Sequence, residues 1–403
     1  MIYDLIVVGG GAAGMMAAIT AAQSGKKVII IEKMDRLGKK ILATGNGRCN
    51  FTNSYYDDSC FRSEQNHFPS LALEQFDHED AITFFQKIGV AVIEKNGYYY
   101  PRSNQASSVA DALICMVQHL KIEIVCNCQV DHVVKKSGQF LVSSEKRQFR
   151  GFHLLIATGG KAQEKLGSDG SGYILAKQFG HRLVEPFPAL TALEIKPHFL
   201  KDAFGVRTQC TITALLDGKE VSKEEGELQI TKYGVSGVMV FQLSRYMIDG
   251  MKKKKKAELN IDFLPEIQEE SDFWKQMAEC AYFKSALQWL EGYFPLKLAL
   301  SLLNKAEISP KKKTEDLSKP EKKRLWKIVK RAPLEVSGWK GFEFAQVTAG
   351  GVSVREVSPY TMESEKVPGL FFAGEILDVD GTCGGYNLQW AWTSGYLAGR
   401  SIV

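Results

Sequence analysis

The sequence has 403 residues, of which 45% are hydrophobic and 24% charged, and its formal net charge is +5 at pH 7. This composition is ordinary for a globular protein, and the length suggests two or three domains. No apolar run reaches the about 20 residues that a membrane-spanning helix needs, so the sequence predicts no membrane segment.

The eight cysteines predict reduced thiols. They form no C-x-x-C pair, and the one close pair, Cys126 and Cys128, lies in an expected strand. The seven histidines show no metal-ligand spacing, so we expect neither a disulfide framework nor a metal site. Because the N-terminus also lacks the basic region of a signal peptide, these features favour a cytoplasmic protein.

The N-terminal stretch predicts a dinucleotide-binding turn. Residues 4–8 have the apolar pattern of a buried parallel strand, and Gly9, Gly11 and Gly14 fill the pattern G-x-G-x-x-G before an Ala-rich helix at 15–24. Gly9 permits the tight turn, Gly11 lets the backbone approach a pyrophosphate, and Gly14 lets the helix pack closely on the strand. The free N–H groups at the start of that helix attract the pyrophosphate.

A carboxylate at the end of the next strand strengthens this prediction. The strand expected at 27–31 ends at Glu32, which is placed to accept hydrogen bonds from an adenosine ribose. A glycine-rich turn without function is the alternative. The complete order of strand, turn, helix, strand and acid favours dinucleotide binding.

The segment at 38–53 predicts a loop around a phosphorylated ligand. It is rich in Gly, Asn and Thr, and Lys39, Lys40 and Arg48 add positive charge. Small residues expose backbone donors, and the segment directly follows the dinucleotide unit. An ordinary polar loop is the alternative.

Further helices and strands are expected before residue 190. The strand at 152–156 runs into Thr158, Gly159 and Gly160, which repeats the small-residue ending of the first strand. Helical spacing predicts helices at 70–90, 106–120 and 173–179, and strand patterns lie at 122–126, 130–135 and 140–143, with a hairpin or surface ridge at 97–102.

A change of pattern near residue 190 predicts an inserted domain at 191–345. Residues 191–265 alternate and are expected to be mainly β, with one helix at 238–246. Residues 266–345 are expected to be mainly helical. Ser318 marks the start of the last of these helices, whose basic residues are expected on its exposed face.

The dinucleotide-binding pattern returns after the insertion. Residues 369–373 form an apolar strand that ends in Gly374 and Glu375, and a glycine-rich loop and a final helix follow. The dinucleotide domain is therefore expected to comprise 1–190 and 346–403.

Positive charge is concentrated in the expected insertion. Residues 301–331 contain eleven Lys and Arg against four Asp and Glu, and 252–256 are five consecutive lysines. A solvated lysine-rich face is one explanation. A polyanion that the inserted domain holds over the active site is the other. The residues expected to contact such a polyanion are Lys252–Lys256, Lys311–Lys313 and Lys322–Arg324.

Motifs along the whole chain resemble those of the BaiN/RdsA-type NAD(P)/FAD-dependent oxidoreductases. The motifs are VVGGGAAG at 7–14, GKKILATGNGRCNFTN at 38–53, LLIATGG at 154–160, TKYGVSG at 231–237, VTAGGV at 347–352 and FFAGEILDVDGTCGGYNLQWAWTSG at 371–395. The resemblance implies an α/β fold. Its Rossmann-like FAD-binding domain would be of the glutathione-reductase class, interrupted by an inserted β-rich and helical domain.

The resemblance also implies which residues bind FAD. The AMP half would contact Gly9, Gly11, Ala12, Ala13 and Glu32, and the Val130 backbone would meet the adenine. The pyrophosphate and flavin would lie against Lys33, Lys40, Gly45, Asn46, Gly47, Arg48 and Cys49. Thr158, Gly159 and Gly160 would pass under the cofactor, and Gly374 and Glu375 would hold the pyrophosphate and ribityl chain. Gly385, Tyr386, Asn387 and Leu388 would place a helix start against the ring, and Gly14, Gly38, Asn50, Asp380 and Gly384 complete the expected site.

The chemistry implied is hydride transfer through FAD. No second G-x-G-x-x-G exists, so NAD(P)H is expected to dock transiently, with another reductant as the alternative. Cys383 and Arg48 are the candidate catalytic residues. The thiols of Cys383 and Cys49 could act as acids or redox partners, or could simply be small residues in tight loops. Tyr386 and Thr348 are possible hydrogen-bond donors at the ring.

Relatives of this type are implied to reduce either a uridine of large-subunit ribosomal RNA or a steroid-like enone. Both reactions add hydride to an activated C=C bond, so three readings of the sequence stay open. The protein is a reductase of a nucleobase in RNA, a reductase or oxidase of a small molecule, or a non-catalytic RNA-binding protein that contains FAD.

Overall fold

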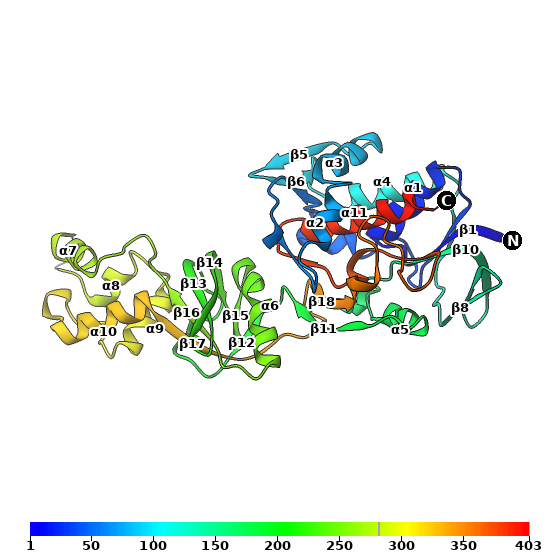
Figure 1. The fold of residues 1–403 in the computed structure, drawn as a ribbon. Helices are drawn as coiled ribbons and strands as arrows, with labels where there is room; N and C mark the ends of the chain where they lie inside the picture. The colour runs from blue at the N-terminus through cyan, green and yellow to red at the C-terminus, as the bar shows by residue number, and fades with distance from the viewer. Residues whose placement is uncertain (281–282, 403) are drawn as a thin grey trace. The chain divides into compact units, whose positions relative to one another are not determined.

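A computed structural model describes residues 1–280 and 283–402 of the chain (Figure 1). The chain divides into two compact units. The first unit comprises Met1–Pro188 and Gln346–Val403, and the second comprises Ala189–Ala345. In the part of the chain that the structure describes, no helix is long and apolar enough to cross a membrane.

A mainly parallel sheet forms the centre of the first unit. Its two central strands pair in parallel from Ile2 with Arg150 to Val8 with Ile156, and its four-residue strand Val28–Ile31 is entirely buried. Apolar runs of this kind are typical of strands covered on both faces. In sheet order the strands are β7 (Glu123–Val125), β2 (Val28–Ile31), β1 (Ile2–Val8), β10 (Gln148–Ile156), β9 (Gln139–Ser143) and β8 (His132–Lys136), with β19 (Leu370–Phe372) beside the end of β10.

The first and last helices of the chain pack closely against each other. α1 (Ala12–Gln23) follows β1, and α11 (Tyr386–Arg400) ends the unit. A Cβ at Gly395 would lie 2.5 Å from the Ala13 carbonyl oxygen, and a Cβ at Gly399 would lie 2.4 Å from that of Ala17. These glycines let two segments over 370 residues apart share one core.

Smaller elements complete the first unit. The segment expected as one helix at 70–90 forms two, because Asp77 caps a new helix through a reciprocal capping box with Asp80. The helices are α2 (Phe68–Leu73), α3 (His78–Lys87), α4 (Ala106–His119) and α5 (Ser171–Gln178), with 3₁₀ helices η1 (Ile41–Gly47), η2 (Asp58–Cys60), η3 (Glu164–Leu166), η6 (Val354–Glu356) and η7 (Gly374–Ile376). The short strands are β3 (Thr52–Asn53), β4 (Phe61–Arg62), β5 (Val92–Lys95), β6 (Tyr98–Pro101), β11 (Leu183–Ala189), β18 (Val347–Val352) and β20 (Asp380–Gly381).

The second unit contains a closed barrel. The strand Ala332–Trp339 lies in the part expected to be mainly helical, yet it closes the barrel by pairing with β12 and β16. Its alternate residues Ala332, Leu334 and Val336 are buried, which is the period of a half-buried strand. In barrel order the strands are β12 (Leu193–Ile195), β15 (Gly234–Ser236), β14 (Lys219–Ile230), β13 (Arg207–Leu216), β16 (Ala257–Asp262) and β17 (Ala332–Trp339).

Helices accompany the barrel in the second unit. The helix expected at 238–246 continues to Lys252, so the lysine run at 252–256 begins inside its last turn. Cations are favourable at a helix C-terminus. The helices are α6 (Val238–Lys252), α7 (Glu270–Cys280), α8 (Ala286–Leu290), α9 (Leu296–Lys305) and α10 (Lys319–Lys330), with 3₁₀ helices η4 (Phe199–Ala203) and η5 (Thr314–Asp316).

The structure confirms that the last of these helices begins after Ser318. Ser318 caps α10, and its backbone N–H donates to Glu321 at 2.8 Å. Lys312 donates to both Glu321 oxygens at 2.8 Å, and Lys312 and Ser318 lower the pKa of Glu321 to about 2. The expectation that all basic residues of this helix face solvent is wrong for Lys330, which is 16% exposed and pairs with Asp262 at 2.7 Å.

A buried histidine in the first unit predicts a loss of stability in mild acid. His181 Nδ1 lies 3.0 Å from Glu356 Oε2, and its Nε2 lies 2.8 Å from Ser364 Oγ. Burial lowers the pKa of His181 below its ordinary 6.5, against the opposing effect of Glu356. The unfolded chain therefore binds more protons below pH 6.5, and the free energy of unfolding should fall as the pH drops through that value.

Urea unfolding at pH 7.5 and pH 5.5 checks this prediction. We expect a lower midpoint at pH 5.5, and a smaller difference between the two pH values in a His181→Gln variant. A wild-type midpoint that rises on acidification would contradict the proposed role of the buried imidazole.

Candidate cofactor site

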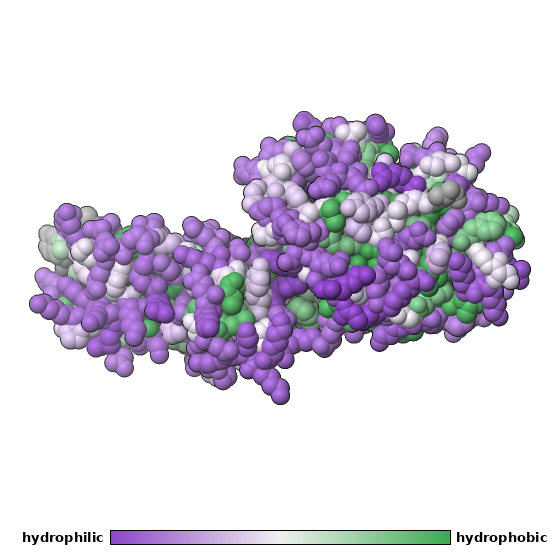
Figure 2. All heavy atoms as spheres, in the orientation of Figure 1, coloured by the Kyte–Doolittle hydropathy of each residue, from purple (hydrophilic) through white to green (hydrophobic). Residues whose placement is uncertain are grey.

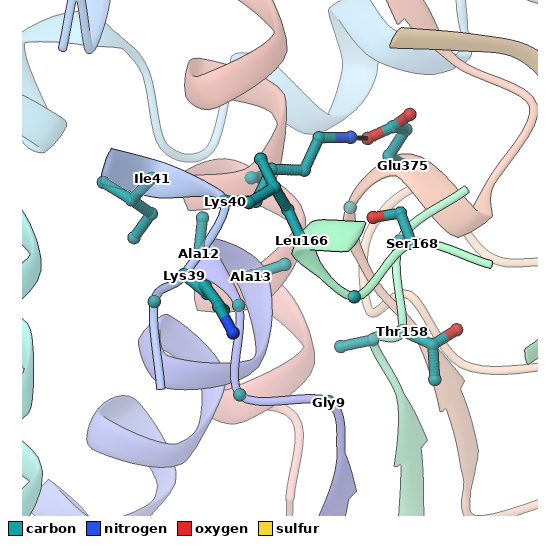
Figure 3. A pocket seen from close by; sticks show the side chains of 18 of the residues that line it. Gly9, Ala12, Ala13, Lys39, Lys40, Ile41, Thr158, Leu166, Ser168 and Glu375 are labelled. Atoms are coloured by element: carbon teal, nitrogen blue, oxygen red, sulfur yellow. Dashed lines mark hydrogen bonds and ion pairs between the residues drawn. The ribbon is translucent and has the colours of Figure 1, made fainter. Parts of the chain in front are cut away.

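A pocket opens in the first unit where β1, β2 and β10 end (Figure 3). Ligands of open α/β folds bind at such carboxyl ends of strands. The lining comes from residues 9–13, 32–44, 157–168, 346–347 and 373–391. The predicted cofactor residues among them are Gly9, Gly11, Ala12, Ala13, Glu32, Gly38, Lys40, Thr158, Gly159, Gly374, Glu375, Asn387 and Leu388.

The three glycines of the first turn have three different surroundings. Gly9 has a φ of +106°, and a Cβ there would lie 2.4 Å from the Ala157 carbonyl oxygen. A Cβ at Gly14 would lie 1.9 Å from the Gly9 carbonyl oxygen. A Cβ at Gly11, in contrast, would meet no protein atom within 4 Å. The protein backbone therefore excludes side chains at Gly9 and Gly14, whereas Gly11 leaves space beside a ligand.

Glu32 is held in one orientation at the end of β2. Its Oε2 accepts a hydrogen bond from the Gly10 N–H and its Oε1 accepts one from the Met34 N–H, each at 2.7 Å. The side chain is buried and lines the pocket. The two backbone donors fix the Glu32 carboxylate, so its remaining lone pairs point in fixed directions. Such a carboxylate is suited to accept hydrogen bonds from ribose hydroxyl groups.

Lys40 and Glu375 form an ion pair at the pocket. Lys40 Nζ lies 2.7 Å from Glu375 Oε2, and Figure 3 shows the two side chains pointing toward each other. The Thr348 N–H donates to Glu375 Oε1 at 2.8 Å. The Thr348 hydroxyl is buried and accepts hydrogen bonds from the N–H groups of Lys161 and Ala162. Thr348 does not line the pocket, so the structure favours a supporting role over the suggested donor role at the ring.

A smaller pocket adjoins the first and contains Val130. The two pockets share Gly9, Glu32, Thr158 and Gly167 among their lining residues. Val130 and Glu32 both line this smaller pocket. Lys33 lines this smaller pocket rather than the main one, and its Nζ pairs with Asp169 at 2.7 Å.

The loop at 45–49 lies outside both pockets. Gly45, Asn46 and Gly47 are exposed and have left-handed backbones, with φ of +56°, +53° and +82°. Arg48 is exposed and its Nε donates to the Gly45 carbonyl oxygen at 3.3 Å. Cys49 is fully buried, and burial raises the pKa of its thiol to about 12. An enclosed thiol that keeps its proton favours, of the two alternatives for Cys49, a small residue in a tight loop.

The glycine-rich loop before α11 and the first turn of α11 hold the remaining predicted residues. Tyr386 is buried, and its hydroxyl donates to the Tyr55 carbonyl oxygen at 3.0 Å instead of reaching the main pocket. Asn387 fixes the loop, because its side chain exchanges hydrogen bonds of 2.9 Å with the Gly381 backbone. Cys383 is partly exposed, and its Sγ lies 4.0 Å from Gln346 Oε1. The predicted residues that line neither pocket are Gly14, Gly45, Asn46, Gly47, Arg48, Cys49, Asn50, Gly160, Asp380, Gly384, Gly385 and Tyr386.

Sequence reasoning missed part of the lining. The missed residues lie at the ends of helices and strands or next to predicted site residues in the sequence. Near Leu166–Ser168, the one sequence feature that could have indicated the pocket is the glycine-rich turn at 167–172. Lys39, expected to add charge at a phosphorylated ligand, does line the pocket, and the missed residues are Gly10, Met34, Arg36, Ile41, Thr44, Ala157, Leu166, Gly167, Ser168, Gln346, Val347, Ala373, Val379, Trp390 and Ala391.

The site fits FAD. Thr158 lines the pocket, yet its buried Oγ1 has no hydrogen-bond partner among the described residues. The buried Asn50 Oδ1 likewise has none within that part of the chain. The clearance at Gly11, the N–H groups at the start of α1 and the cations Lys39 and Lys40 suit a pyrophosphate. In residues 1–280 and 283–402, no three His, Cys, Asp or Glu side chains are grouped as metal ligands.

The family model of the HI0933-like protein Rossmann domain matches residues 3–401. The chain belongs to this family. The match confirms the resemblance found in the motifs and the predicted fold class. The chain also aligns over its whole length with the solved 3-ketosteroid-Δ4-(5α)-dehydrogenase of Rhodococcus jostii, at a TM-score of 0.50 and 15% identity, covering 96% of that chain. This likeness supports the fold.

Two curated relatives of this HI0933-like protein have named reactions. It is 41% identical over 380 residues to the 3-dehydro-bile acid delta(4,6)-reductase of Clostridium scindens, which covers 94% of this chain and 93% of the relative. It is 31% identical over 404 residues to the ribosomal RNA dihydrouridine synthase of Escherichia coli, which covers 100% of this chain and 98% of the relative.

Proposed function

We propose that this protein is an FAD-dependent reductase that adds hydride to the C=C bond of a uridine in large-subunit ribosomal RNA. The product is dihydrouridine, and the electron donor is NAD(P)H. The full-length likeness to a reductase and to a dihydrouridine synthase supports the reaction class, because both names describe reduction of a C=C bond conjugated to a carbonyl.

Bound FAD supplies the hydride transfer. The residues of the chain bind and orient it. Glu32 receives the ribose, the start of α1 and Lys40 meet the pyrophosphate, and the start of α11 presents free N–H groups that favour negative charge on the ring. We assign proton donation at the acceptor to Cys383, which is partly exposed in the loop before α11. We assign Arg48 to the pyrophosphate or to the acceptor carbonyl, since its guanidinium is exposed.

The distribution of charge carries the choice of RNA as the acceptor. Residues 189–345 contain 27 Lys and Arg against 22 Asp and Glu, whereas the rest of the chain contains 24 of each. The whole net charge of +5 therefore belongs to the second unit. A unit with this excess is attracted to a phosphate backbone.

A steroid-like enone is the second candidate acceptor. The 41% identity to the bile acid reductase is higher than the 31% to the ribosomal RNA enzyme, which favours it. The reaction type is the same, so the two candidates differ in the molecule that receives the hydride.

Nucleoside analysis of ribosomal RNA from a strain that lacks the gene tests the proposal. We expect dihydrouridine to disappear from large-subunit RNA and to return with a plasmid copy. Unchanged dihydrouridine in the deletion strain would overturn the RNA assignment. The purified protein should then be assayed with a 3-keto-4-ene steroid, and NAD(P)H should bleach its flavin absorbance under either candidate. If NAD(P)H fails to bleach the flavin, the non-catalytic reading gains support.

A further inference from the structure

The exposed side of α10 carries a regular row of cations. Lys319, Lys323 and Lys327 follow one another at every fourth position of α10, Arg331 is the residue at which the helix ends, and all four are exposed. Residues four apart lie on the same face of a helix. In the part of the chain that the structure describes, none of the four forms an ion pair with a carboxylate. We call these four residues the basic stripe.

Other cations in the same segment are engaged inside the second unit. Lys312 holds Glu321, Lys330 holds Asp262, and Arg324 Nε donates to the Ala306 carbonyl oxygen at 2.9 Å. The structure therefore separates the basic residues at 311–331 into those that hold the fold together and those of the basic stripe. Figure 2 shows a mostly hydrophilic surface in the region of α9 and α10, at the left of Figure 1.

The basic stripe is unfavourable for the helix that carries it. Like charges four residues apart on a helix repel, and α10 contains two such pairs, Lys319 with Lys323 and Lys323 with Lys327. Lys319 adds a positive charge to the first turn of α10, where the helix dipole favours negative charge. Within the described residues, no carboxylate forms an ion pair with these cations to offset the repulsion. An anionic partner would compensate it.

We propose that the basic stripe is the surface that binds the phosphate backbone of the RNA substrate. At a rise of 1.5 Å per residue Lys319, Lys323 and Lys327 extend over about 12 Å of helix, and Arg331 follows at its end, which suits several successive phosphates. This inference rests on the proposed function and names the surface that recognises its substrate. Lys312 and Arg324, which were among the predicted RNA contacts, are no longer expected to bind RNA. The residues of the basic stripe, which have no carboxylate partners, are expected to do so instead.

A pair of variants with equal charge tests the basic stripe. The stripe variant carries Lys319→Gln, Lys323→Gln, Lys327→Gln and Arg331→Gln. The control variant carries Lys196→Gln, Arg207→Gln, Lys275→Gln and Lys340→Gln, four cations of the second unit that pair with Glu335, Glu227, Glu279 and Glu194 at 2.5–4.0 Å. Both lose four positive charges, so only the position of the charges differs.

Binding of a large-subunit ribosomal RNA fragment is measured against salt concentration with the FAD-loaded proteins. Each lost phosphate contact should reduce the slope of log affinity against log salt by about 1, so the stripe variant should lose about 3–4 units. The control should lose less than about 1. Because the substitutions relieve the repulsion, the melting temperature of the stripe variant should be unchanged or higher. If the four cations instead stabilised the fold, the melting temperature would fall.

The outcomes separate this inference from the proposed function. Equal losses in both variants, or an unchanged slope in the stripe variant, would overturn the basic stripe while the wild-type enzyme still binds and modifies RNA. Absence of RNA binding by the wild type would overturn the proposed function and the stripe with it. If the stripe variant kept RNA binding but lost binding to phosphatidylserine vesicles, the stripe would be a membrane contact and the inference wrong.

Discussion

The Gly11→Val variant should fold as the wild type does and lose its FAD. A Cβ at Gly11 meets no protein atom within 4 Å, so the new side chain disturbs no contact of the protein. Gly11 lines the pocket, and its side chain would take space needed by the pyrophosphate. A side chain that overpacks a site costs about 1–3 kcal/mol, which for FAD binding corresponds to a roughly 5- to 150-fold loss of affinity.

Flavin absorbance of the purified protein and titration of the apoprotein with FAD measure this loss. The matched control is Gly14→Val, whose Cβ would lie 1.9 Å from the backbone oxygen of Gly9. That variant should lower the melting temperature and the soluble yield, because backbone cannot move aside as a side chain can. If Gly11→Val kept wild-type FAD affinity, the pyrophosphate would not lie at this turn.

Removal of both partners of the Lys40–Glu375 pair should destabilise the protein less than the two single removals added together. The two side chains are only 25% and 19% exposed, so Lys40→Met leaves the Glu375 carboxylate partly buried with the Thr348 N–H as a donor. A buried group without its partner destabilises by about 1–3 kcal/mol. The double variant Lys40→Met/Glu375→Gln removes both charges, and its loss should be smaller than the sum of the single losses.

A double-mutant cycle on the apoprotein, followed by urea unfolding, measures this coupling. We expect a coupling energy of about 0.5–3 kcal/mol. Both variants that lack Lys40 should also bind FAD more weakly, since Lys40 lines the pocket and supplies positive charge. Losses that simply add would show that the pair contributes nothing at this site, and unchanged FAD affinity would remove Lys40 from the cofactor site.

The strand-turn-helix of the first 24 residues could be predicted because its signal is local. The glycine spacing, the apolar strand and Glu32 all lie within one short segment, and the structure brings them together at one pocket. The strand β17 could not be predicted in the same way. Its eight residues follow a helix directly, and they form a strand because two distant strands, β12 and β16, offer unpaired edges.

The candidate site shows the same division. Tyr386 and Cys49 belong to motifs that predict a place at the cofactor. In the structure the Tyr386 hydroxyl donates a hydrogen bond to the Tyr55 carbonyl oxygen, and Cys49 is enclosed in the core. The basic clusters were predicted by composition alone. Their division into the basic stripe and the lysines that hold carboxylates depends on partners such as Asp262, which is 68 residues from Lys330.

The sequence by itself determined the dinucleotide-binding fold, the FAD-type motifs and the concentration of positive charge in one segment. These features depend on residue type and short spacing, which the chain carries directly. Only the tertiary structure decided at which glycines a side chain would collide with the protein backbone and at which one it would take the space of a ligand. It also decided which polar atoms lack partners and which cations are free to meet an anion. Each of these depends on distances between residues far apart in the chain, and only folding sets those distances.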